Sequence, residues 1–379
     1  MGYCRKAVRS IILTIYCKEM KTKIVILSAF LTPFRSGAEA CAEEVPLQLC
    51  DQFDFTIITA RLRRDLPKED MLQGKIPVKR IGFGFWFDKW LYPFLAPREA
   101  KKFNPKIVHA ILETFAGEAL MHCKNILPNT KRILTLQTTN RTFRKKKIIQ
   151  FADVVTAISK YLAGIAADMG RKDVTVIPNG IDYDAIRSAC AKYPKVPGRI
   201  LFVGRLEKMK GVDVLLNAFL KLKIENAKSK ITLHVVGDGS QHASLQNLAR
   251  ELGIADYVSF KGYLRAPEVY REYAEAEVFC GLSRSEALGN VFLEAQAAGC
   301  SVIATHVGGI SETVQHDTTG LLVPPDDIEA VVRQWEILTQ TSVRETIARN
   351  GTQHAAKYDW KLIANKYAEI YKSFTLSGS

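Results

Sequence analysis

Two glutamates eight positions apart, in the stretch SRSEALGNVFLEAQAAG (283–299), are the side chains of this sequence best placed to do chemistry. Between Glu286 and Glu294 stands Gly289-Asn290, which signals the start of a helix. The free N–H groups and positive dipole end of a helix start favour a phosphate. A carboxylate repels phosphate, so the glutamates should bind hydroxyl groups, each accepting two hydrogen bonds from a vicinal diol. A nucleoside diphosphate sugar offers diols at both ends and a pyrophosphate between them. The alternative for Glu294 is that it only complements the dipole of the helix start and binds no ligand.

Cations and glycine turns follow other apolar runs of the second half. In GRLEKMKG (204–211), Arg205 offers a planar fork and Lys210 a point charge, and the two can converge on one anion. The turns in VVGDG (235–239) and HVGGISE (306–312) allow close approach by a ligand or by another stretch of backbone. Ligands of open parallel sheets bind beyond the carboxyl ends of the strands, so all these groups are expected at one edge.

The elements that must position these groups are predicted by short apolar runs alternating with stretches long enough for helices. The runs of the first half are KIVILSAF (23–30), FTIITA (55–60), KIVHAIL (106–112) and RILTLQT (132–138). Those of the second half are RILFVGR (199–205), ITLHVVGDG (231–239), VSFKGY (258–263), VFCGLS (278–283) and CSVIATHVGG (300–309). This rhythm is typical of parallel sheets with crossover helices, and 379 residues suffice for two cores. We therefore expect an α/β protein with two doubly wound, Rossmann-like domains.

Turn and helix signals divide the chain into four segments. Residues 1–20 are expected to be an N-terminal extension, and VTVIPNGIDYDAI (174–186) marks the boundary between a domain at 21–185 and one at 186–358. Residues 359–379 have the spacing of an amphipathic helix, which we expect to pack on the first domain.

Composition limits the class of protein and its partners. The eight cysteines form no CxxC pair and no ligand cluster with the seven histidines, which argues against a structural zinc site and indicates a cytoplasmic protein. No apolar run approaches the roughly 18 residues that span a bilayer. Of the net charge of +14, residues 1–185 supply most, with 30 Lys and Arg against 18 Asp and Glu. A basic half attracts anionic lipids, membrane surfaces or nucleic acid, unless it is merely a solvated face.

Two segments of the basic half suggest a membrane surface. RIGFGFWFDKWLYPFLAPR (80–98) mixes aromatic side chains with cations, which suits the headgroup level of a bilayer or a lipid-carrier acceptor. RTFRKKK (141–147) adds five positive charges, each worth on the order of 1 kcal/mol near an anionic leaflet. Peripheral attachment to the inner face of the membrane is therefore one prediction, and an aromatic core beside a solvated basic face is the alternative.

In their order and spacing, GRLEKMKG, VVGDG, SRSEALGNVFLEAQAAGCSVIAT and VGGISETVQHDTTGLLVPPDD resemble the nucleotide-sugar-binding half of the retaining GT-B glycosyltransferases of family four. RSGAEA (35–40), KIVHA (106–110) and residues 152–182 resemble the first half of the same family, so the resemblance covers residues 21–375. It implies two domains facing a central cleft, with the C-terminal helix crossing back to the first. The implied reaction moves a sugar from a nucleotide-diphosphate sugar to a hydroxyl of a glycan, lipid-linked or small-molecule acceptor, with retention of configuration.

The resemblance also implies a role for each matching residue. Arg205 and Lys210 would neutralise the donor diphosphate, Glu294 would hold the ribose, and Glu286 would be the catalytic residue at the transferred sugar. The other donor-binding positions are Gly37 from across the cleft, Tyr263 near the base, and Leu288, Gly289, Asn290 and Val291. No metal and no cofactor is expected, because cations and helix amides can offset the charge of the departing diphosphate. That phosphate would itself deprotonate the acceptor.

The sequence departs from the family where many relatives carry a histidine and this chain has Gln137, which can hydrogen-bond a sugar hydroxyl but cannot take a proton. His109, at another strand end, is the alternative on the acceptor side, unless it is a buried histidine with structural partners. Two other classes of protein remain open. A sugar-nucleotide epimerase would need acid–base residues that the 283–299 block does not supply, and a basic nucleic-acid-binding protein would leave Glu286 and Glu294 unexplained, so no nucleic acid is expected.

Overall fold

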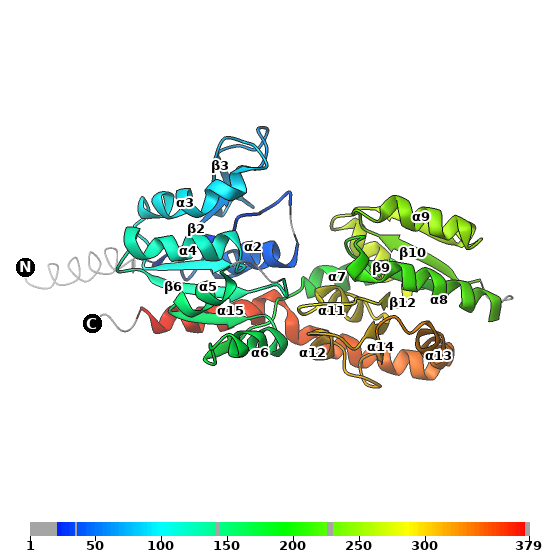
Figure 1. The fold of residues 1–379 in the computed structure, drawn as a ribbon. Coiled ribbons are helices and arrows are strands. Elements are labelled where there is room, and N and C mark those ends of the chain that lie inside the picture. Colours follow the sequence, from blue (N-terminus) through cyan, green and yellow to red (C-terminus); the bar gives the residue numbers. More distant parts are fainter. Residues whose placement is uncertain (1–20, 35, 141–143, 226–229, 376–379) are drawn as a thin grey trace, which may run out of the picture.

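The computed structural model describes residues 21–34, 36–140, 144–225 and 230–375. Figure 1 shows two lobes side by side, each a sheet covered by helices, with the chain crossing between them near their common boundary. Within the described residues, no helix is both long and apolar enough to cross a membrane.

The first lobe holds an eight-stranded sheet in the order β3-β4-β2-β1-β5-β6-β7-β8. Its strands are β1 (Lys23–Leu27), β2 (Asp54–Ala60), β3 (Glu69–Leu72), β4 (Ile76–Ile81), β5 (Ile107–Ile111), β6 (Lys131–Leu136), β7 (Val154–Ala157) and β8 (Val174–Val176). Its helices are α2 (Gly37–Leu49), α3 (Asp88–Lys101), α4 (Phe115–Ile126), α5 (Lys145–Phe151) and α6 (Lys160–Asp168). Neighbouring strands pair in parallel except β3 and β4, which form an antiparallel edge that the apolar runs did not predict. Every residue of β5 is buried, as expected for a strand covered by helices on both faces.

The second lobe holds a six-stranded parallel sheet in the order β11-β10-β9-β12-β13-β14. Its strands are β9 (Val196–Val203), β10 (Thr232–Val236), β11 (Val258–Gly262), β12 (Ala276–Gly281), β13 (Ser301–Thr305) and β14 (Leu321–Val323). Its helices are α7 (Tyr183–Cys190), η1 (Lys208–Lys210), α8 (Val212–Glu225), α9 (His242–Glu251), η2 (Ala255–Tyr257), α10 (Glu268–Glu275), α11 (Asn290–Ala297), α12 (Ile310–Thr313), α13 (Ile328–Thr339), α14 (Thr341–Ala355) and η3 (Ala356–Tyr358). The predicted pair of doubly wound, Rossmann-like α/β sheets is confirmed.

The last helix, α15 (Trp360–Ser373), returns to the first lobe and packs beside α2 (Figure 1). Its buried face joins the core between α2 and the sheet through Ile363, Tyr367 and Tyr371. The chain passes between the lobes at two adjacent points, where the Trp360 N–H donates to the carbonyl of Ile181. The helix therefore belongs to the core of the first lobe although it is last in sequence.

Each sheet contains a point where strand order reverses. In the second sheet the chain runs from β9 outward to β10 and β11 and then returns to place β12 on the other side of β9. In the first sheet the same reversal separates β1 from β5. A doubly wound sheet opens a crevice at its reversal, beyond the carboxyl ends of the two strands.

Candidate active site

Lys210 and Glu286 meet at the reversal of the second sheet. Lys210 follows β9, Glu286 follows β12, and the Lys210 ammonium donates to Glu286 Oε2 at 2.5 Å. Each side chain is only about one-sixth exposed, at 17% and 16%, so the pair is partly shielded from water. The structure thus brings together two predicted site residues that are 76 positions apart in sequence.

A third charged side chain, which the sequence interpretation missed, ties the two loops together. Arg284 donates to both carboxylate oxygens of Asp213, at 3.1 and 2.8 Å, and to Asp326 at 2.7 Å. Its backbone N–H donates to the carbonyl of Met209, within the turn that carries Lys210. Arg284 therefore fixes the spacing between the Lys210 turn and the Glu286 loop. Its place two residues before Glu286 was the available signal.

Glycine turns permit the close approach of these loops. A Cβ on Gly211, whose φ is 65°, would lie 2.0 Å from the carbonyl oxygen of Leu282. A Cβ on Gly308 would lie 2.0 Å from the carbonyl oxygen of Glu286, and a Cβ on Gly237 would lie 1.9 Å from that of Gly204. The glycine turns thus let another stretch of backbone approach closely, as predicted.

Helix α11 begins immediately after the Glu286 loop, as predicted. Gly289 has a φ of 91°, in the left-handed region, and Asn290 is the first helical residue. Leu288 is buried against the core of the first lobe, while Val291 is partly buried. The first amides of α11 consequently lie at the boundary between the lobes, beside the Lys210–Glu286 pair.

Glu294 lies one turn into α11 and is held by a tyrosine from α10. The Tyr273 hydroxyl donates to Glu294 Oε2 at 2.8 Å, and Tyr273 is fully buried. Burial and then the negative charge of Glu294 hold the pKa of Tyr273 well above its usual value, so its hydroxyl remains a donor. Tyr273 was not predicted as part of the site, because nothing in its local sequence marks it.

The first lobe presents Gly37 to the start of α11. A Cβ on Gly37 would lie 3.6 Å from Asn179 Nδ2 and 3.7 Å from Asn290 Nδ2, so this backbone reaches the facing lobe. Gln137 and Asn179 exchange two side-chain hydrogen bonds, of 3.1 and 2.9 Å, and Asn179 also donates to the carbonyl of Gly37 at 3.3 Å. Gln137 is thus fixed behind Gly37 by its amide pairing.

A buried ion pair supports the loop that follows Gln137. Glu113 accepts from the N–H of Gln137 at 2.9 Å and pairs with Lys145 at 2.8 Å, with side-chain exposures of 0% and 4%. Lys145 also donates to the carbonyl of Thr138 at 2.7 Å. The hydroxyl of Thr139 in this loop lies 3.3 Å from that of Ser285, across the lobe boundary. This pair holds the first lobe against the Glu286 loop.

The interpretation of the basic run 141–147 as a uniform membrane-facing segment needs correction. Residues 141–143 lie outside the described residues, Lys145 is buried in its pair with Glu113, and Arg144 pairs with Glu118 at 2.5 Å. Lys146 and Lys147 are exposed. Sequence alone could not separate these roles, because the carboxylates that neutralise the run come from other elements.

His109 does not lie with the other predicted site residues. It is fully buried in β5, with Nδ1 2.7 Å from the hydroxyl of Tyr371 and Nε2 2.7 Å from that of Thr135. Desolvation lowers its pKa to about 3, so the ring is neutral. Both ring nitrogens are engaged in the core beneath α15, and the side chain is not available to an acceptor.

Arg205 and Tyr263 are exposed residues that follow strands of the second sheet. Arg205 follows β9 and is exposed, whereas Tyr263 follows β11 with 56% of its surface exposed and Arg265 5.9 Å from its ring centre. Within the part of the chain that the structure describes, neither side chain forms a hydrogen bond or an ion pair with Lys210 or Glu286. Their exposure leaves both side chains free to move toward a ligand.

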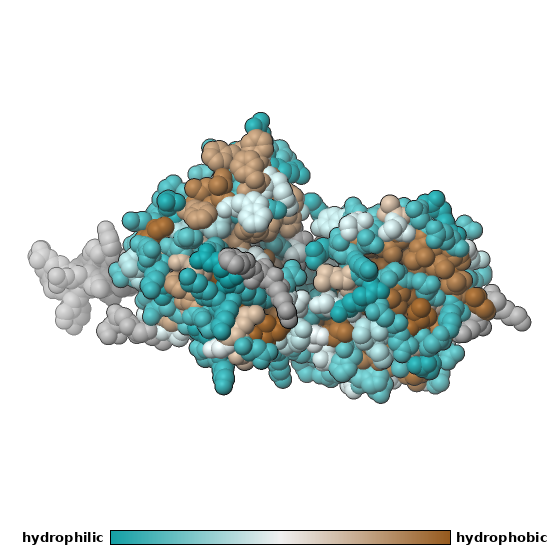
Figure 2. Space-filling view, viewed as in Figure 1, coloured by the Kyte–Doolittle hydropathy of each residue, from teal (hydrophilic) through white to brown (hydrophobic). Residues whose placement is uncertain are grey.

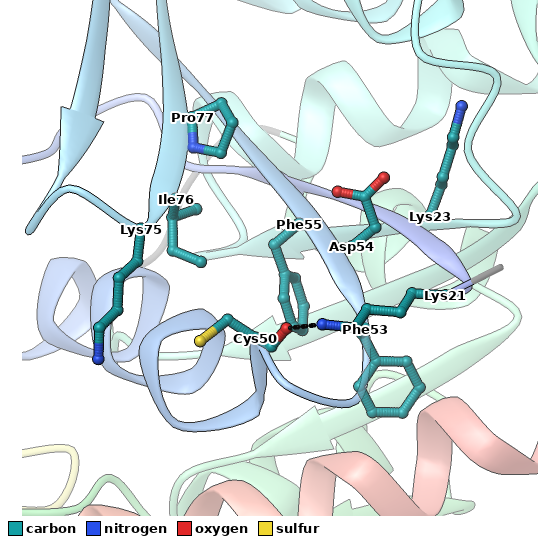
Figure 3. Close-up of a pocket in the computed structure, with 9 residues that line it drawn as sticks. All are labelled: Lys21, Lys23, Cys50, Phe53, Asp54, Phe55, Lys75, Ile76 and Pro77. Carbon is teal, nitrogen blue, oxygen red and sulfur yellow. Dashed lines mark hydrogen bonds between the residues drawn. The ribbon is translucent and has the colours of Figure 1, made fainter. Parts of the chain in front are cut away.

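Two hollows are lined by other residues. One, of about 300 Å³, is lined by residues at the amino ends of β1, β2 and β4, including Lys23, Asp54 and Ile76 (Figure 3). It is therefore at the opposite edge of the first sheet. The other, of about 550 Å³, lies beyond β13 and β14 and is lined by His306, His316 and Pro324 among others. Neither contains Lys210, Glu286 or Glu294.

Two doubly wound, Rossmann-like lobes that meet at a common boundary are the architecture of the GT-B class of proteins. Residues 35–185 match the family model described as Glycosyltransferase Family 4, and residues 191–354 match the one described as Glycosyl transferases group 1. The chain belongs to this glycosyltransferase family. The resemblance inferred from the sequence motifs is confirmed.

Curated relatives match part of the chain. A D-inositol 3-phosphate glycosyltransferase of Thermobispora bispora is 33% identical over 221 residues, which are 52% of this chain and 50% of the relative. A GDP-mannose-dependent alpha-(1-6)-phosphatidylinositol monomannoside mannosyltransferase of Mycobacterium tuberculosis is 31% identical over 248 residues, which are 60% and 63% of the two chains. The matched region thus spans about half to two-thirds of these relatives.

Solved structures share the whole fold. Sucrose-phosphate synthase from Thermosynechococcus elongatus has a TM-score of 0.82 at 20% identity, covering 94% of this chain and 100% of that one. The Anabaena protein HepE, in complex with UDP and glucose, has a TM-score of 0.77 at 20% identity, covering 93% and 100%. At this identity the likeness establishes the fold.

Proposed function

We propose that the protein transfers a sugar from a nucleotide-diphosphate sugar to an acceptor hydroxyl. The observation that carries the proposal is the Lys210–Glu286 pair at the sheet reversal, beside the amino end of α11. A cation and free helix amides suit a diphosphate, and a carboxylate next to them suits the hydroxyls of the attached sugar. The family to which the chain belongs supports this assignment.

In this proposal each group has one task. Arg205 and Lys210 neutralise the diphosphate, aided by the α11 amides at Gly289, Asn290 and Val291. Gly37 lets the facing backbone approach the same phosphates. These charges take over the role that a metal ion plays in other transferases, so the nucleoside diphosphate leaves the sugar without the help of a metal or a cofactor.

The two glutamates divide the remaining ends of the donor. Glu294, oriented by Tyr273, accepts hydrogen bonds from the ribose hydroxyls, and Tyr263 lies near the base. Glu286 faces the transferred sugar and stabilises the positive charge that develops there. Lys210 leaves Glu286 for the diphosphate when the donor binds, because a phosphate competes for the same ammonium.

The reaction is proposed to retain the anomeric configuration. Gln137 cannot act as a base, and its amide is committed to Asn179. The departing phosphate oxygen, on the same face as the acceptor, then takes the acceptor proton. The anomeric proton coupling in an NMR spectrum of the first-formed product tests retention. A coupling that indicates the anomeric configuration opposite to that of the donor would contradict it.

Donor binding is tested by thermal shift against UDP, GDP and ADP sugars, using the wild type, Arg205→Ala and Glu294→Ala. We expect one donor to stabilise the wild type and both variants to lose most of that gain. Glu329→Ala is the control, because Glu329 pairs with Lys221 within the second lobe and away from the site. Absence of stabilisation by any nucleotide sugar would refute the assignment.

We further propose that the acceptor is glycan- or lipid-linked and is met at an anionic membrane surface. The names of the two relatives, which specify an inositol phosphate and a phosphatidylinositol mannoside, support an acceptor of this kind. The structural support is an exposed group, here called the aromatic patch, formed by Phe83, Phe85, Trp86, Phe87, Trp90 and Phe94. Figure 2 shows apolar side chains gathered on the first lobe over the region that carries β3 and α3.

The aromatic patch is held in its exposed arrangement by a buried carboxylate. Asp88 is 1% exposed and accepts from the N–H groups of Gly84 and Phe85 at 2.7 and 3.1 Å. Cations stand over the rings, with Lys89 4.4 Å from the Trp86 centroid and Arg64 4.2 Å from that of Phe85. Amphipathic rings with nearby cations fit the headgroup level of an anionic bilayer.

Flotation with vesicles tests this part of the proposal. The wild type should float with phosphatidylglycerol vesicles and less with phosphatidylcholine, and Phe83→Ser/Trp90→Ser should remain at the bottom. Tyr257→Ser is the control, since Tyr257 is an exposed aromatic of the second lobe with Lys223 3.8 Å above its ring. Equal flotation of the patch variant and the wild type would contradict a membrane role for the patch.

A further inference from the structure

A carboxylate of the second lobe caps a helix of the first. Glu312 Oε2 accepts from the N–H of Lys160 at 2.8 Å, and Oε1 accepts from that of Tyr161 at 3.0 Å. These are the first two amides of α6, and the third available donor, at Leu162, bonds to Ser159 within the first lobe. Both carboxylate oxygens of one side chain are thus committed to the other lobe.

The electrostatics of this contact are favourable. The amino end of a helix carries a partial positive charge, and its first N–H groups have no partner inside the helix. Two hydrogen bonds to an ionised carboxylate are stronger than bonds between neutral groups. Lys160 and Tyr161 are exposed, so water can take the place of the carboxylate at these amides if the lobes separate.

The element that bears Glu312 also holds the Glu286 loop. Glu312 lies in α12, and Gly309, immediately before α12, donates its N–H to the carbonyl of Glu286 at 3.1 Å. At the other end of α12, the Thr313 hydroxyl lies within hydrogen-bond reach of the carbonyls of Leu288, at 3.3 Å, and Ile310, at 3.0 Å. Helix α12 therefore contacts the first lobe through the side chain of Glu312, and its two ends contact the Glu286 loop.

We propose that Glu312 is a positioning residue, a latch that couples closure of the two lobes to the placement of Glu286. The inference rests on the proposed function for the importance of Glu286, but the latch itself is a property of the fold. When α6 is capped, α12 is anchored and the Glu286 loop is held beside Lys210. When the lobes part, α12 loses its anchor and the loop loosens.

Glu312→Gln tests the latch, because it keeps the shape of the side chain but removes one of the two hydrogen bonds to α6. The amide nitrogen that replaces one carboxylate oxygen cannot accept from an N–H. Amide exchange at residues 160 and 161 should accelerate about tenfold, the equivalent of about 1.4 kcal/mol. Acetylation of Lys210 by acetic anhydride, followed by mass spectrometry, should accelerate several-fold, because its partner Glu286 is less well held. In the transfer assay kcat should fall about tenfold, while the KM for the donor stays within about threefold.

Asp327→Asn is the matched control. Asp327 caps α13 by accepting from the N–H of Ala330 at 2.8 Å, entirely within the second lobe. It should leave exchange at 160–161 and acetylation of Lys210 at wild-type rates. Unchanged exchange at 160–161 in Glu312→Gln would refute the latch, and faster exchange with unchanged Lys210 acetylation would refute its coupling to Glu286. If the wild type transfers no sugar, the proposed function fails. Amide exchange at 160–161 and acetylation of Lys210 still test the latch in that case.

Discussion

The hydrogen bond between Tyr273 and Glu294 allows a sharp test of the ribose site. Tyr273→Phe removes only the hydroxyl oxygen that donates to Glu294 Oε2 at 2.8 Å, inside a fully buried side chain. The ring remains, so packing against Phe279, whose centroid is 5.8 Å away, is preserved. The perturbation is therefore confined to the orientation of one carboxylate.

The size of the effect follows from the charge on the acceptor. A hydrogen bond to an ionised group is worth about 1.5–3 kcal/mol, more than one between neutral groups. Part of this is lost from folding stability and part from ligand binding, because the carboxylate must be reoriented before it can accept from a diol. We expect the Kd of the nucleoside diphosphate to rise about tenfold, the equivalent of about 1.4 kcal/mol.

Calorimetric titration with the nucleoside diphosphate that most stabilises the wild type measures the effect, and its 2′,3′-dideoxy form isolates the diol. The wild type should prefer the ribose form strongly, Tyr273→Phe less, and Glu294→Ala not at all. Tyr92→Phe is the control, because Tyr92 is also fully buried and donates at 2.8 Å, but to the carbonyl of Ile58 in the first lobe. Equal affinity of Tyr273→Phe and the wild type for the ribose form would refute the role of the tyrosine.

Three further predictions concern the backbone and the buried charges. Gly289→Ala should lower the melting temperature and abolish stabilisation by nucleotide, because the left-handed conformation alone costs about 1–2 kcal/mol and the new Cβ would lie 2.5 Å from a ring carbon of Phe292. The control is Gly253→Ala, which is also left-handed but has open space around it and should lower only the melting temperature. Glu113→Gln should lower the free energy of unfolding, measured by urea titration, by about 3–5 kcal/mol, because the substitution leaves the Lys145 ammonium buried without its partner. Adding Lys145→Met should recover part of this loss, and no recovery would contradict the ion-pair explanation. The pKa of His109 is lowered to about 3 in the folded state, so between pH 6.5 and 3 the unfolded chain binds a proton that the folded protein does not, and the free energy of unfolding falls as the pH drops through this range. At pH 5 the loss is about 2 kcal/mol relative to a pH above 6.5, and His109→Gln should not show this loss. Equal pH slopes for the wild type and His109→Gln would count against a buried neutral ring.

The loops of the site leave a signal in the local sequence, whereas the partners of its side chains do not. Strand ends are visible as apolar runs followed by glycine or charge, so Lys210, Glu286 and Gly289 were expected at one edge, and the structure places them there. Arg284 and Tyr273 were missed. Their roles depend on Asp213 and Glu294, which lie 71 and 21 positions away and give no local signal.

Partners from distant elements also account for the positions of Lys145 and His109. Lys145 belongs to a run that local sequence marks as basic surface, yet its partner Glu113 follows a different strand and draws it into the interior. His109 ends up beneath α15, a helix more than 250 positions away, and its hydrogen bond to Tyr371 removes it from the site. In both cases the deciding neighbour is contributed by another element.

By itself, the sequence determined the two doubly wound sheets, the order of their loops and the family of the protein, because period, turn residues and motif spacing are local properties of the chain. Only the tertiary structure decided which cation meets which carboxylate, which charges are buried, and which side chain of one lobe reaches the other. Those outcomes depend on strand order and on the approach of the lobes, since an interaction between two charged groups is set by their distance in space and their exposure to water. The contact between Glu312 and the start of α6 joins positions 152 apart in the sequence, and only the folded chain brings them together.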